Sequence, residues 1–416
     1  AAISHRPTLT YTFRVLDSEV LNAFAVPGGY VYFTRGIMAH FNNEAEFAGV
    51  LGHEIGHITA RHSAQQQTRQ ILGQGGLIAG VILAPEIVGS MAESAMQGLQ
   101  LLFLSYSRDA ERESDKLGVS YSTEIGYDAK QMAGFFRTLQ RQDSLASGGG
   151  RLPSFMSTHP DPGERNQTVY KLAVDLQQQK GAQNLAVNRD NYLAMVEGIK
   201  FGPDPRQGFV EGNAFYHPEL RFQFPIPQGW RTQNEPSRVV LASPDGKAIS
   251  MLTLAQAASP REAAQTFVTN NKINVTDSRD VTVNGLPAFA IQGTIVQQQQ
   301  QQQQQAAPSL STLSYFIQHE NRIYIIAGLS ETVNFNQYAQ ILNTVPQGFR
   351  NLTDQAKLNK QPERIHIRSV SQGGSLQQAL TRLGMPATRM QELAILNGMY
   401  LTDAVQAGQK IKIIGN

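Results

Sequence analysis

A short run of histidine and glutamate within a helical segment constrains this chain more than any other feature. His53, Glu54 and His57 follow the pattern H-E-x-x-H. Asn43 precedes the segment as a candidate N-cap, and acidic residues follow in the first turn, where the helix dipole favours negative charge. Apolar residues recur at the spacing of one helical face: Phe47, Val50, Leu51, Ile55 and Ile58. The pattern predicts a helix with one buried face that begins after Asn43.

The spacing within this helix also predicts a metal site. His53 and His57 lie four residues apart, so both rings point from the same helical face and can bind one ion. Glu54 lies beside that ion without having to bind it. This is the position of a general base that takes a proton from a zinc-activated water. Because so short a pattern also arises by chance in unrelated proteins, the interpretation requires a further ligand.

A second charged stretch, residues 107–115, supplies candidates for that ligand. It reads S-R-D-A-E-R-E-S-D and is compatible with a helix. A catalytic zinc ion takes three protein ligands and leaves one position for water, and Glu111 is the candidate third ligand. Asp115 lies four residues later on the same face, where it can accept the outer N–H of a ligating histidine. The alternative is an ordinary solvated charge face.

Together these motifs resemble a known family of zinc metallopeptidases. H-E-x-x-H followed by S-R-x-x-E-x-E-x-D resembles the family of the HtpX-like proteases and CAAX-prenyl endoproteases, and within it the soluble periplasmic BepA-like branch. Residues 22–29 and 157–160, with Arg165, match further family motifs in the same order. Ser114 stands where the family usually has alanine. The resemblance covers roughly the first 170 to 200 residues.

The resemblance implies an enzyme with zinc as its cofactor. By position, His53, His57 and Glu111 are the expected zinc ligands. Glu54 is the expected base of a gluzincin-type endopeptidase that hydrolyses peptide bonds. The family also implies a protein or peptide substrate and a periplasmic or cell-envelope location, with a signal peptide presumed removed.

A hairpin is expected to lead into an edge strand over residues 30–34. Zinc endopeptidases of this architecture commonly receive an extended substrate at a sheet edge, by adding it as a further strand. Tyr30, Val31 and Tyr32 are therefore candidate substrate-binding residues, together with Arg165. Alternatively, the strand only supports the metal helix.

His159 lies in a predicted loop, residues 153–162, that follows three consecutive glycines and precedes Pro160. Glycines beside a histidine-bearing loop favour a mobile flap. The histidine can take the fourth position on zinc and keep the enzyme latent, or it can hydrogen-bond to the oxyanion of the reacting carbonyl as a catalytic residue. The third possibility is a turn histidine with a structural role.

Two neighbouring features have less specific interpretations. His62 follows His57 by five residues and, on a continuous helix, would point from a different face, so we expect a structural role. Residues 65–104 are rich in Gly, Ala and Gln and are predicted to form two helices. These helices are expected to pack as a core hairpin, or alternatively to cover the cleft or touch a membrane surface peripherally.

Composition excludes several other classes of function. The 416 residues are 41% hydrophobic and 16% charged, which is typical of a globular protein of several domains. A net charge of +2 gives no reason to expect nucleic acid as a partner. The chain has no cysteine, which excludes thiol catalysis, disulfides and thiolate metal sites. Its most apolar run, residues 77–84, is too short for a membrane span of about 20 residues.

The expected fold class is α+β, in three domains. Residues 1–200 should form a mainly helical, zincin-type metallopeptidase domain with a small edge sheet. Residues 209–352 resemble the PsbP-like α+β fold, with a hairpin at Asn284-Gly285 and a polyglutamine loop over residues 297–305. This second domain carries no set of catalytic residues and is interpreted as a binding or spacer module.

Residues 362–416 resemble a small LysM-type module with the order β-α-α-β. Such modules bind peptidoglycan, which is therefore a possible partner. Gly-Gly-Ser at residues 373–375 replaces the customary Gly-Asp-Thr, so a plain scaffold is the equal alternative.

The whole pattern predicts a zinc endopeptidase of the bacterial cell envelope, acting in protein quality control or outer-membrane protein assembly. One alternative is an envelope chaperone or assembly factor whose metal site is structural or held shut. Another is a cell-wall-binding protein with a latent protease domain.

Overall fold

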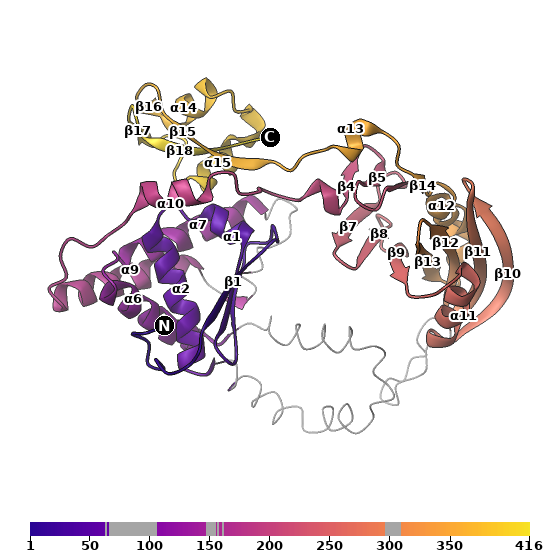
Figure 1. Ribbon diagram of the computed structural model, residues 1–416, viewed down its shortest axis with the longest axis horizontal. Helices are drawn as coiled ribbons and strands as arrows, with labels where there is room; N and C mark the ends of the chain where they lie inside the picture. Colours follow the sequence, from indigo (N-terminus) through magenta and orange to yellow (C-terminus); the bar gives the residue numbers. More distant parts are fainter. Residues whose placement is uncertain (63–64, 66–105, 147–154, 156–157, 160–161, 296–308) are drawn as a thin grey trace. The chain divides into compact units, whose positions relative to one another are not determined.

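The computed structural model describes residues 1–62, 65, 106–146, 155, 158–159, 162–295 and 309–416 (Figure 1). The apolar run, the triple glycine and the polyglutamine loop of the sequence analysis lie outside these residues, as does the predicted helix pair after Gln65. The described chain forms two compact units. The first combines residues 1–202 with residues 363–416, and the second comprises residues 203–362. The unit borders lie close to the predicted domain borders, but the C-terminal segment is part of the first unit and not a separate one.

Three short strands form the N-terminal sheet of the first unit, in the order β1-β3-β2. Their bounds are β1 Thr12–Leu16, β2 Ala23–Val26 and β3 Tyr30–Thr34. The predicted hairpin is present as the antiparallel pair β2–β3, and β1 runs parallel to β3. The expectation that residues 30–34 form an edge strand is wrong, because β1 and β2 occupy both sides of β3.

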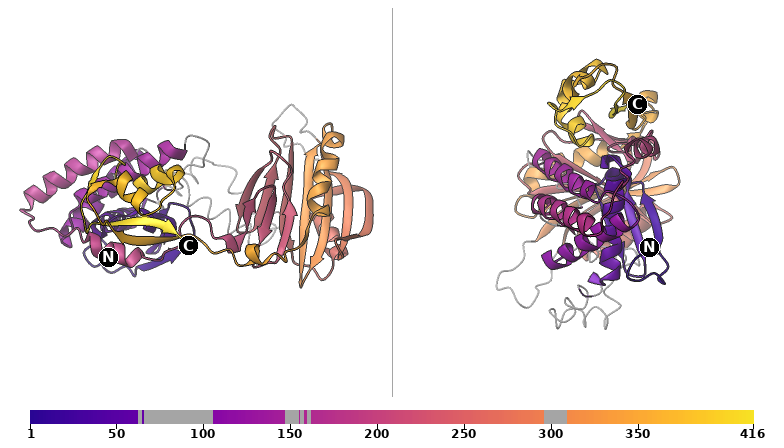
Figure 2. Two further views of the ribbon diagram at one scale, coloured as in Figure 1. Left: turned by 90° about the horizontal axis from the view of Figure 1, so that it is seen from above. Right: turned by 90° about the vertical axis from the view of Figure 1, so that its left-hand side faces the viewer.

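Helices pack beside this sheet, as the right-hand view of Figure 2 shows. They are α1 Arg35–His40, α2 Glu44–Thr59, α6 Arg108–Glu124, α7 Lys130–Ala146, α9 Pro162–Gln179 and α10 Arg189–Val196. Helix α2 begins as predicted, with the side chain of Asn43 accepting a hydrogen bond from the N–H of Glu46. Helices α2 and α6 approach closely because Gly52 and Gly118 face each other. A Cβ atom on Gly118 would lie 2.9 Å from the backbone nitrogen of His53.

The C-terminal segment packs on the helices of the first unit. Its elements are β15 Arg364–Ser369, β16 Gly374–Ser375, α14 Leu376–Arg382, α15 Met390–Leu396, β17 Ala404–Val405 and β18 Lys410–Gly415. β15 and β18 pair antiparallel, so the main elements follow the expected order β-α-α-β. The buried ammonium of Lys412 donates to the carbonyl oxygen atoms of Ala39 and Phe41, at 2.8 and 2.5 Å. The LysM assignment and its peptidoglycan contact remain predictions.

The second unit is built on a seven-stranded antiparallel sheet, ordered β10-β11-β12-β13-β9-β8-β7. These strands are β7 Arg231–Glu235, β8 Arg238–Ala242, β9 Ala248–Ala255, β10 Ile273–Val283, β11 Leu286–Ile295, β12 Leu310–His319 and β13 Arg322–Glu331. A smaller sheet, ordered β14-β6-β5-β4, contains β4 Phe209–Glu211, β5 Ala214–His217, β6 Phe222–Pro225 and β14 Arg350–Asn351. The predicted hairpin turn at Asn284-Gly285 joins β10 to β11.

Two helices, α11 Pro260–Asn270 and α12 Phe335–Gln347, cover opposite faces of the larger sheet. Side chains alternate between its faces along β12. Accordingly, Tyr315 and Ile317 pack in one core cluster with residues of α12, whereas Phe316 packs in another with residues of α11. The left-hand view of Figure 2 shows these strands side by side. The molecule is therefore a mixed α+β protein, as predicted, with its helical domain at the N-terminus.

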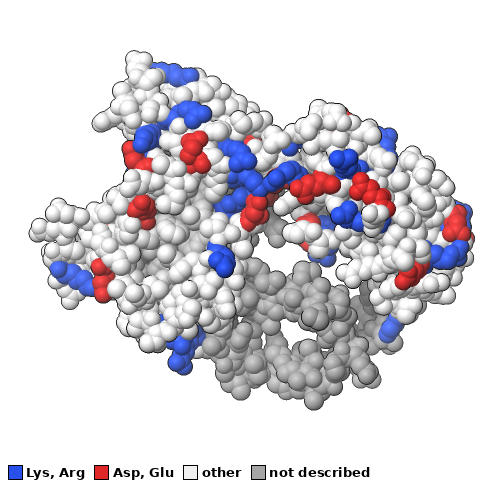
Figure 3. All heavy atoms as spheres, viewed as in Figure 1, with Lys and Arg blue, Asp and Glu red and all other residues white. Residues whose placement is uncertain are grey.

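Surface charge is sparse and mixed in sign. On the face drawn in Figure 3, the described Lys and Arg residues lie beside Asp and Glu without forming a large field of one sign. In the part of the chain that the structure describes, no helix has the length and apolar character needed to cross a membrane.

Candidate metal centre

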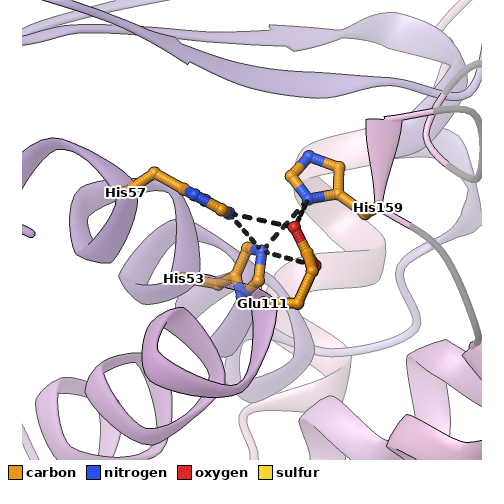
Figure 4. Close-up of side chains that lie close together, drawn as sticks. All are labelled: His53, His57, Glu111 and His159. Atoms are coloured by element: carbon orange, nitrogen blue, oxygen red, sulfur yellow. Dashed lines mark hydrogen bonds and ion pairs between the residues drawn. The ribbon is translucent and has the colours of Figure 1, made fainter. Parts of the chain in front are cut away.

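Two helices bring the predicted zinc ligands together. Helix α2 presents His53 and His57 from one face, and the Nε2 atoms of the two rings lie 3.0 Å apart. Glu111, in the first turn of α6, directs its carboxylate at the same point, as Figure 4 shows. Its oxygen atoms lie 3.6 Å from Nε2 of His53 and 3.4 Å from Nε2 of His57. All three side chains are buried.

His159 adds a fourth side chain to this cluster. Its Nδ1 lies 2.9 Å from Oε1 of Glu111 and 3.3 Å from Nε2 of His53. The backbone N–H of His159 donates to the carbonyl oxygen of Phe155, and the two rings stack with centroids 4.4 Å apart. The described part of the predicted flap therefore holds its histidine in the metal site.

The spacing of these atoms fits a tetrahedral metal ion. One ligand atom from each of the four residues lies within 4.8 Å of all the others. A tetrahedral zinc site with bonds of about 2.0–2.2 Å would separate its ligand atoms by about 3.3–3.6 Å. Three of the observed separations, 3.3, 3.4 and 3.6 Å, lie in this range, and the other two, 2.9 and 3.0 Å, are slightly shorter. Nitrogen lone pairs that converge at such distances repel one another unless a cation lies between them.

An ion pair supports the ligands from outside. Oδ1 of Asp115 lies 3.0 Å from Nδ1 of His53, so the sequence-predicted partner of a ligating histidine is in contact with it. Arg165 holds both carboxylates, with its nitrogen atoms 2.6 Å from Oδ1 of Asp115 and 2.8 Å from Oε2 of Glu111. Burial alone would raise the pKa of Asp115, but the charge of Arg165 and the hydrogen bonds outweigh it and lower the pKa.

Arg165 does not lie on a surface where it could contact substrate. Its side chain is only 7% exposed and lies over the ring of Phe136. Its guanidinium is committed to Asp115 and Glu111. The predicted contact of Arg165 with substrate therefore has no support in this arrangement, and its visible role is to hold the carboxylates of the metal site.

The strand predicted to receive substrate, β3, is likewise not positioned for that role. β3 is paired on both sides, so Tyr30, Val31 and Tyr32 have no free backbone groups for a substrate strand. Val31 is fully buried, and the ring of Tyr32 stacks on Phe24. Their predicted role by strand addition is therefore wrong, because β3 lies in the middle of the sheet.

Glu54 is fully buried beside the cluster. Neither of its carboxylate oxygen atoms has a hydrogen-bond partner among the described residues. Oε1 lies 3.6 Å from Nε2 of His159. Burial raises the pKa of Glu54, although the neighbouring histidines oppose the shift. An unpartnered buried carboxylate is costly to maintain, which points to a functional requirement.

Two further residues of the site were missed by sequence reasoning. Tyr106 stacks on His57, with ring centroids 3.9 Å apart, and its backbone N–H donates to the carbonyl oxygen of Thr158 beside His159. No sequence pattern marked Tyr106. His62 was expected on another helical face, but the helix ends at Thr59 and Arg61 has a positive φ of 59°. This left-handed turn brings Nδ1 of His62 to 3.1 Å from Nδ1 of His57.

Comparison with known proteins agrees with this geometry. Residues 1–173 match the model of peptidase family M48. Residues 1–173 are thus similar to peptidase family M48. Peptidases of this family are zinc-dependent, and the metal-binding cluster lies wholly within the matched residues.

M48 relatives include proteases of bacteria and mitochondria. A putative beta-barrel assembly-enhancing protease of Vibrio cholerae is 34% identical over 162 residues, covering 37% of this chain and 33% of that protein. The mitochondrial metalloendopeptidase OMA1 of Arabidopsis thaliana is 32% identical over 175 residues, covering 42% and 34%. The beta-barrel assembly-enhancing protease of Escherichia coli K12 is 29% identical over 162 residues, covering 37% and 33%. The chain thus spans about a third of the length of these curated relatives.

Outside the M48 domain, similarity to solved structures is weak. The solution structure of cyanobacterial PsbP from Synechocystis covers 35% of this chain and 96% of that protein, with a TM-score of 0.28 and 9% identity. A score this low carries no argument, so the finer PsbP-like assignment of residues 209–352 remains a prediction.

Proposed function

We propose that this chain is a zinc-dependent endopeptidase. The observation that carries the proposal is the convergence of His53, His57 and Glu111 on one point, with the buried Glu54 beside them. A structural metal site does not require a buried carboxylate that lacks a hydrogen-bond partner among the described residues. A hydrolytic site requires one as a general base.

Different residues of the site would bind the metal ion and transfer protons. His53, His57 and Glu111 would hold the ion, and Asp115 and Arg165 fix the directions of these ligands. A bound zinc ion would polarise the scissile carbonyl and acidify the attacking water. Glu54 takes the proton of that water and later donates it to the leaving amine.

The activities named for the similar proteins suggest a biological setting. Several are beta-barrel assembly-enhancing proteases, and this chain shares their M48 segment. We therefore propose action on proteins of the bacterial envelope, in quality control or in outer-membrane protein assembly. An assembly factor whose protease domain is latent is the second candidate, and the presence of His159 in the metal cluster favours it.

The Glu54→Gln variant tests the enzymatic proposal. Glutamine preserves the size of the side chain but cannot take a proton, so zinc binding should persist and casein hydrolysis should be lost. Zinc content and casein cleavage, with and without a chelator, are the measurements. The matched control is Glu124→Gln at the exposed end of α6, which should cleave like the parent. Undiminished cleavage by Glu54→Gln would show that Glu54 is not the base.

A further inference from the structure

The two histidine ligands have different outer partners. Nδ1 of His53 faces the carboxylate of Asp115 at 3.0 Å. Nδ1 of His57 instead faces Nδ1 of His62 at 3.1 Å. A metal-binding histidine normally donates its outer N–H to a carboxylate, a carbonyl oxygen or water. A neutral imidazole in this position is unusual and sets a condition on where the protons lie.

Metal coordination by His57 determines the tautomer of His57, which in turn determines the tautomer of His62. If Nε2 of His57 binds the ion, the proton of His57 is on Nδ1, which donates to Nδ1 of His62. His62 must then carry its own proton on Nε2. That atom lies 3.2 Å from Oε2 of Glu113, which can accept the hydrogen bond. The two histidines and the glutamate form a continuous hydrogen-bonded chain with a single consistent direction.

This hydrogen-bonded chain connects the buried metal ligand His57 to solvent. His57 is fully buried and His62 is nearly so, whereas the side chain of Glu113 is 61% exposed. The rings of His57 and His62 meet edge to face, with centroids 5.1 Å apart. The hydroxyl of Ser114 lies 3.2 Å from Nδ1 of His62 and competes for the same nitrogen lone pair.

We infer that His62 is a positioning residue for the metal site, which acts by accepting the outer N–H of His57 and is itself oriented by Glu113. The inference rests on the proposed zinc site and extends it to residues that bind neither metal nor substrate. Its effect should appear first in metal affinity, because an unoriented ring binds the ion less well. Loss of such a partner typically weakens metal binding by about 10–100-fold.

Three substitutions of His62 distinguish its role as a hydrogen-bond acceptor from its role in packing. His62→Gln retains an acceptor of similar reach, and should bind zinc nearly as tightly as the parent. His62→Leu fills the space without an acceptor, and should bind zinc about 10–100-fold more weakly. His62→Ala removes both features and should bind no better than His62→Leu. Zinc affinity is measured on the full chain by competition with a chromogenic chelator.

Substitutions of the outer residues test the direction of the hydrogen-bonded chain. Glu113→Gln keeps an acceptor for Nε2 of His62 and should retain affinity, whereas Glu113→Ala should lose part of it. Asp109→Ala is the matched control, since Asp109 is an exposed carboxylate on the same helix that pairs only with Arg112 among the described residues. Ser114→Ala removes the competing hydroxyl and should bind zinc no more weakly than the parent.

A spectroscopic measurement reports on ligand geometry independently of activity. The visible absorption bands of the cobalt(II)-loaded protein depend on the arrangement of the ligands. They should shift in His62→Leu and stay close to the parent spectrum in His62→Gln. If the parent binds zinc and His62→Leu binds it equally well, the positioning role is wrong while the zinc site stands. If the parent itself binds no zinc at this site, the proposed function and the inference both fail.

Discussion

His159 supplies a fourth ligand atom to a cluster that three protein ligands would already complete for catalysis. The side chain is buried, its ring stacks on Phe155, and its Nε2 has no hydrogen-bond partner among the described residues. A resting site with four protein ligands has no position left for water. The arrangement therefore favours latency over a role in binding the oxyanion.

The His159→Ala variant distinguishes these roles. If His159 blocks the open position, its removal should raise the basal rate of casein hydrolysis. If it stabilises the oxyanion instead, kcat should fall by about 10²–10³. An unchanged rate would leave only a structural role. His366→Ala, in a partly exposed histidine of the same unit that pairs with Glu197, is the control and should cleave like the parent.

Sequence reasoning at this scale succeeded where regular helix geometry applied. The four-residue spacing of His53 and His57 was sufficient to predict that both rings face one point, whereas Glu111 was a candidate from its charged stretch and from the family resemblance. The same geometry gave the wrong face for His62, because the helix ends before it and Arg61 adopts a left-handed conformation that its sequence does not signal. Helical periodicity does not predict residues that enter the site through a turn or through ring stacking.

At the scale of elements, contacts between segments distant in sequence decide what a strand or helix can do. Tyr30–Thr34 was correctly predicted as a strand, but its central position depends on β1, which joins it in parallel and not through a hairpin. Likewise, the β-α-α-β order of the C-terminal segment gave no sign of its docking. Lys412 on β18 reaches carbonyl groups more than 370 residues earlier in the chain.

The Lys412→Met variant tests this docking. Lys412 is fully buried and donates to the carbonyl oxygen atoms of Ala39, Phe41 and Leu396. Burial lowers the pKa of Lys412, and the charge of Glu46 on the metal helix opposes that shift. Loss of the ammonium leaves buried acceptors unpaired, so unfolding of the first unit should become easier by about 3 kcal/mol.

The same strand provides the control for this variant. Lys410 lies two residues away, is 40% exposed and pairs with Asp190 at the surface. Lys410→Met should change the free energy of unfolding by less than about 1 kcal/mol. Urea titrations followed by far-ultraviolet circular dichroism give both values. Equal effects of the two substitutions would contradict a specific anchoring role for Lys412.

At the scale of the whole molecule, the chain leaves the first unit and returns to it at one place. The backbone N–H of Phe201 donates to the carbonyl oxygen of Glu363 at 2.7 Å, and Ile365 donates to Ile199 at 3.0 Å. The two crossing points are therefore adjacent antiparallel segments of the first unit. Residues 203–362 form an insertion between them. The sequence resemblances suggested a separate domain over residues 209–352, but the paired backbone is what shows that the ends of the insertion meet.

Adjacent ends predict that the insertion can be removed. Replacing residues 203–362 by a short glycine linker should leave the first unit folded, with the zinc affinity of the full chain, because its described metal cluster and the backbone pairing described within it lie outside the insertion. Residues 203–362 alone should also fold, and the single tryptophan, Trp230, should report this through its buried environment. Deletion of residues 363–416 is the contrasting variant. It removes Lys412 and the strand partner of residues 198–201, and should destabilise the first unit. If excision of the insertion abolished zinc binding, or if loss of the C-terminal segment had no effect on stability, this division of the chain would be wrong.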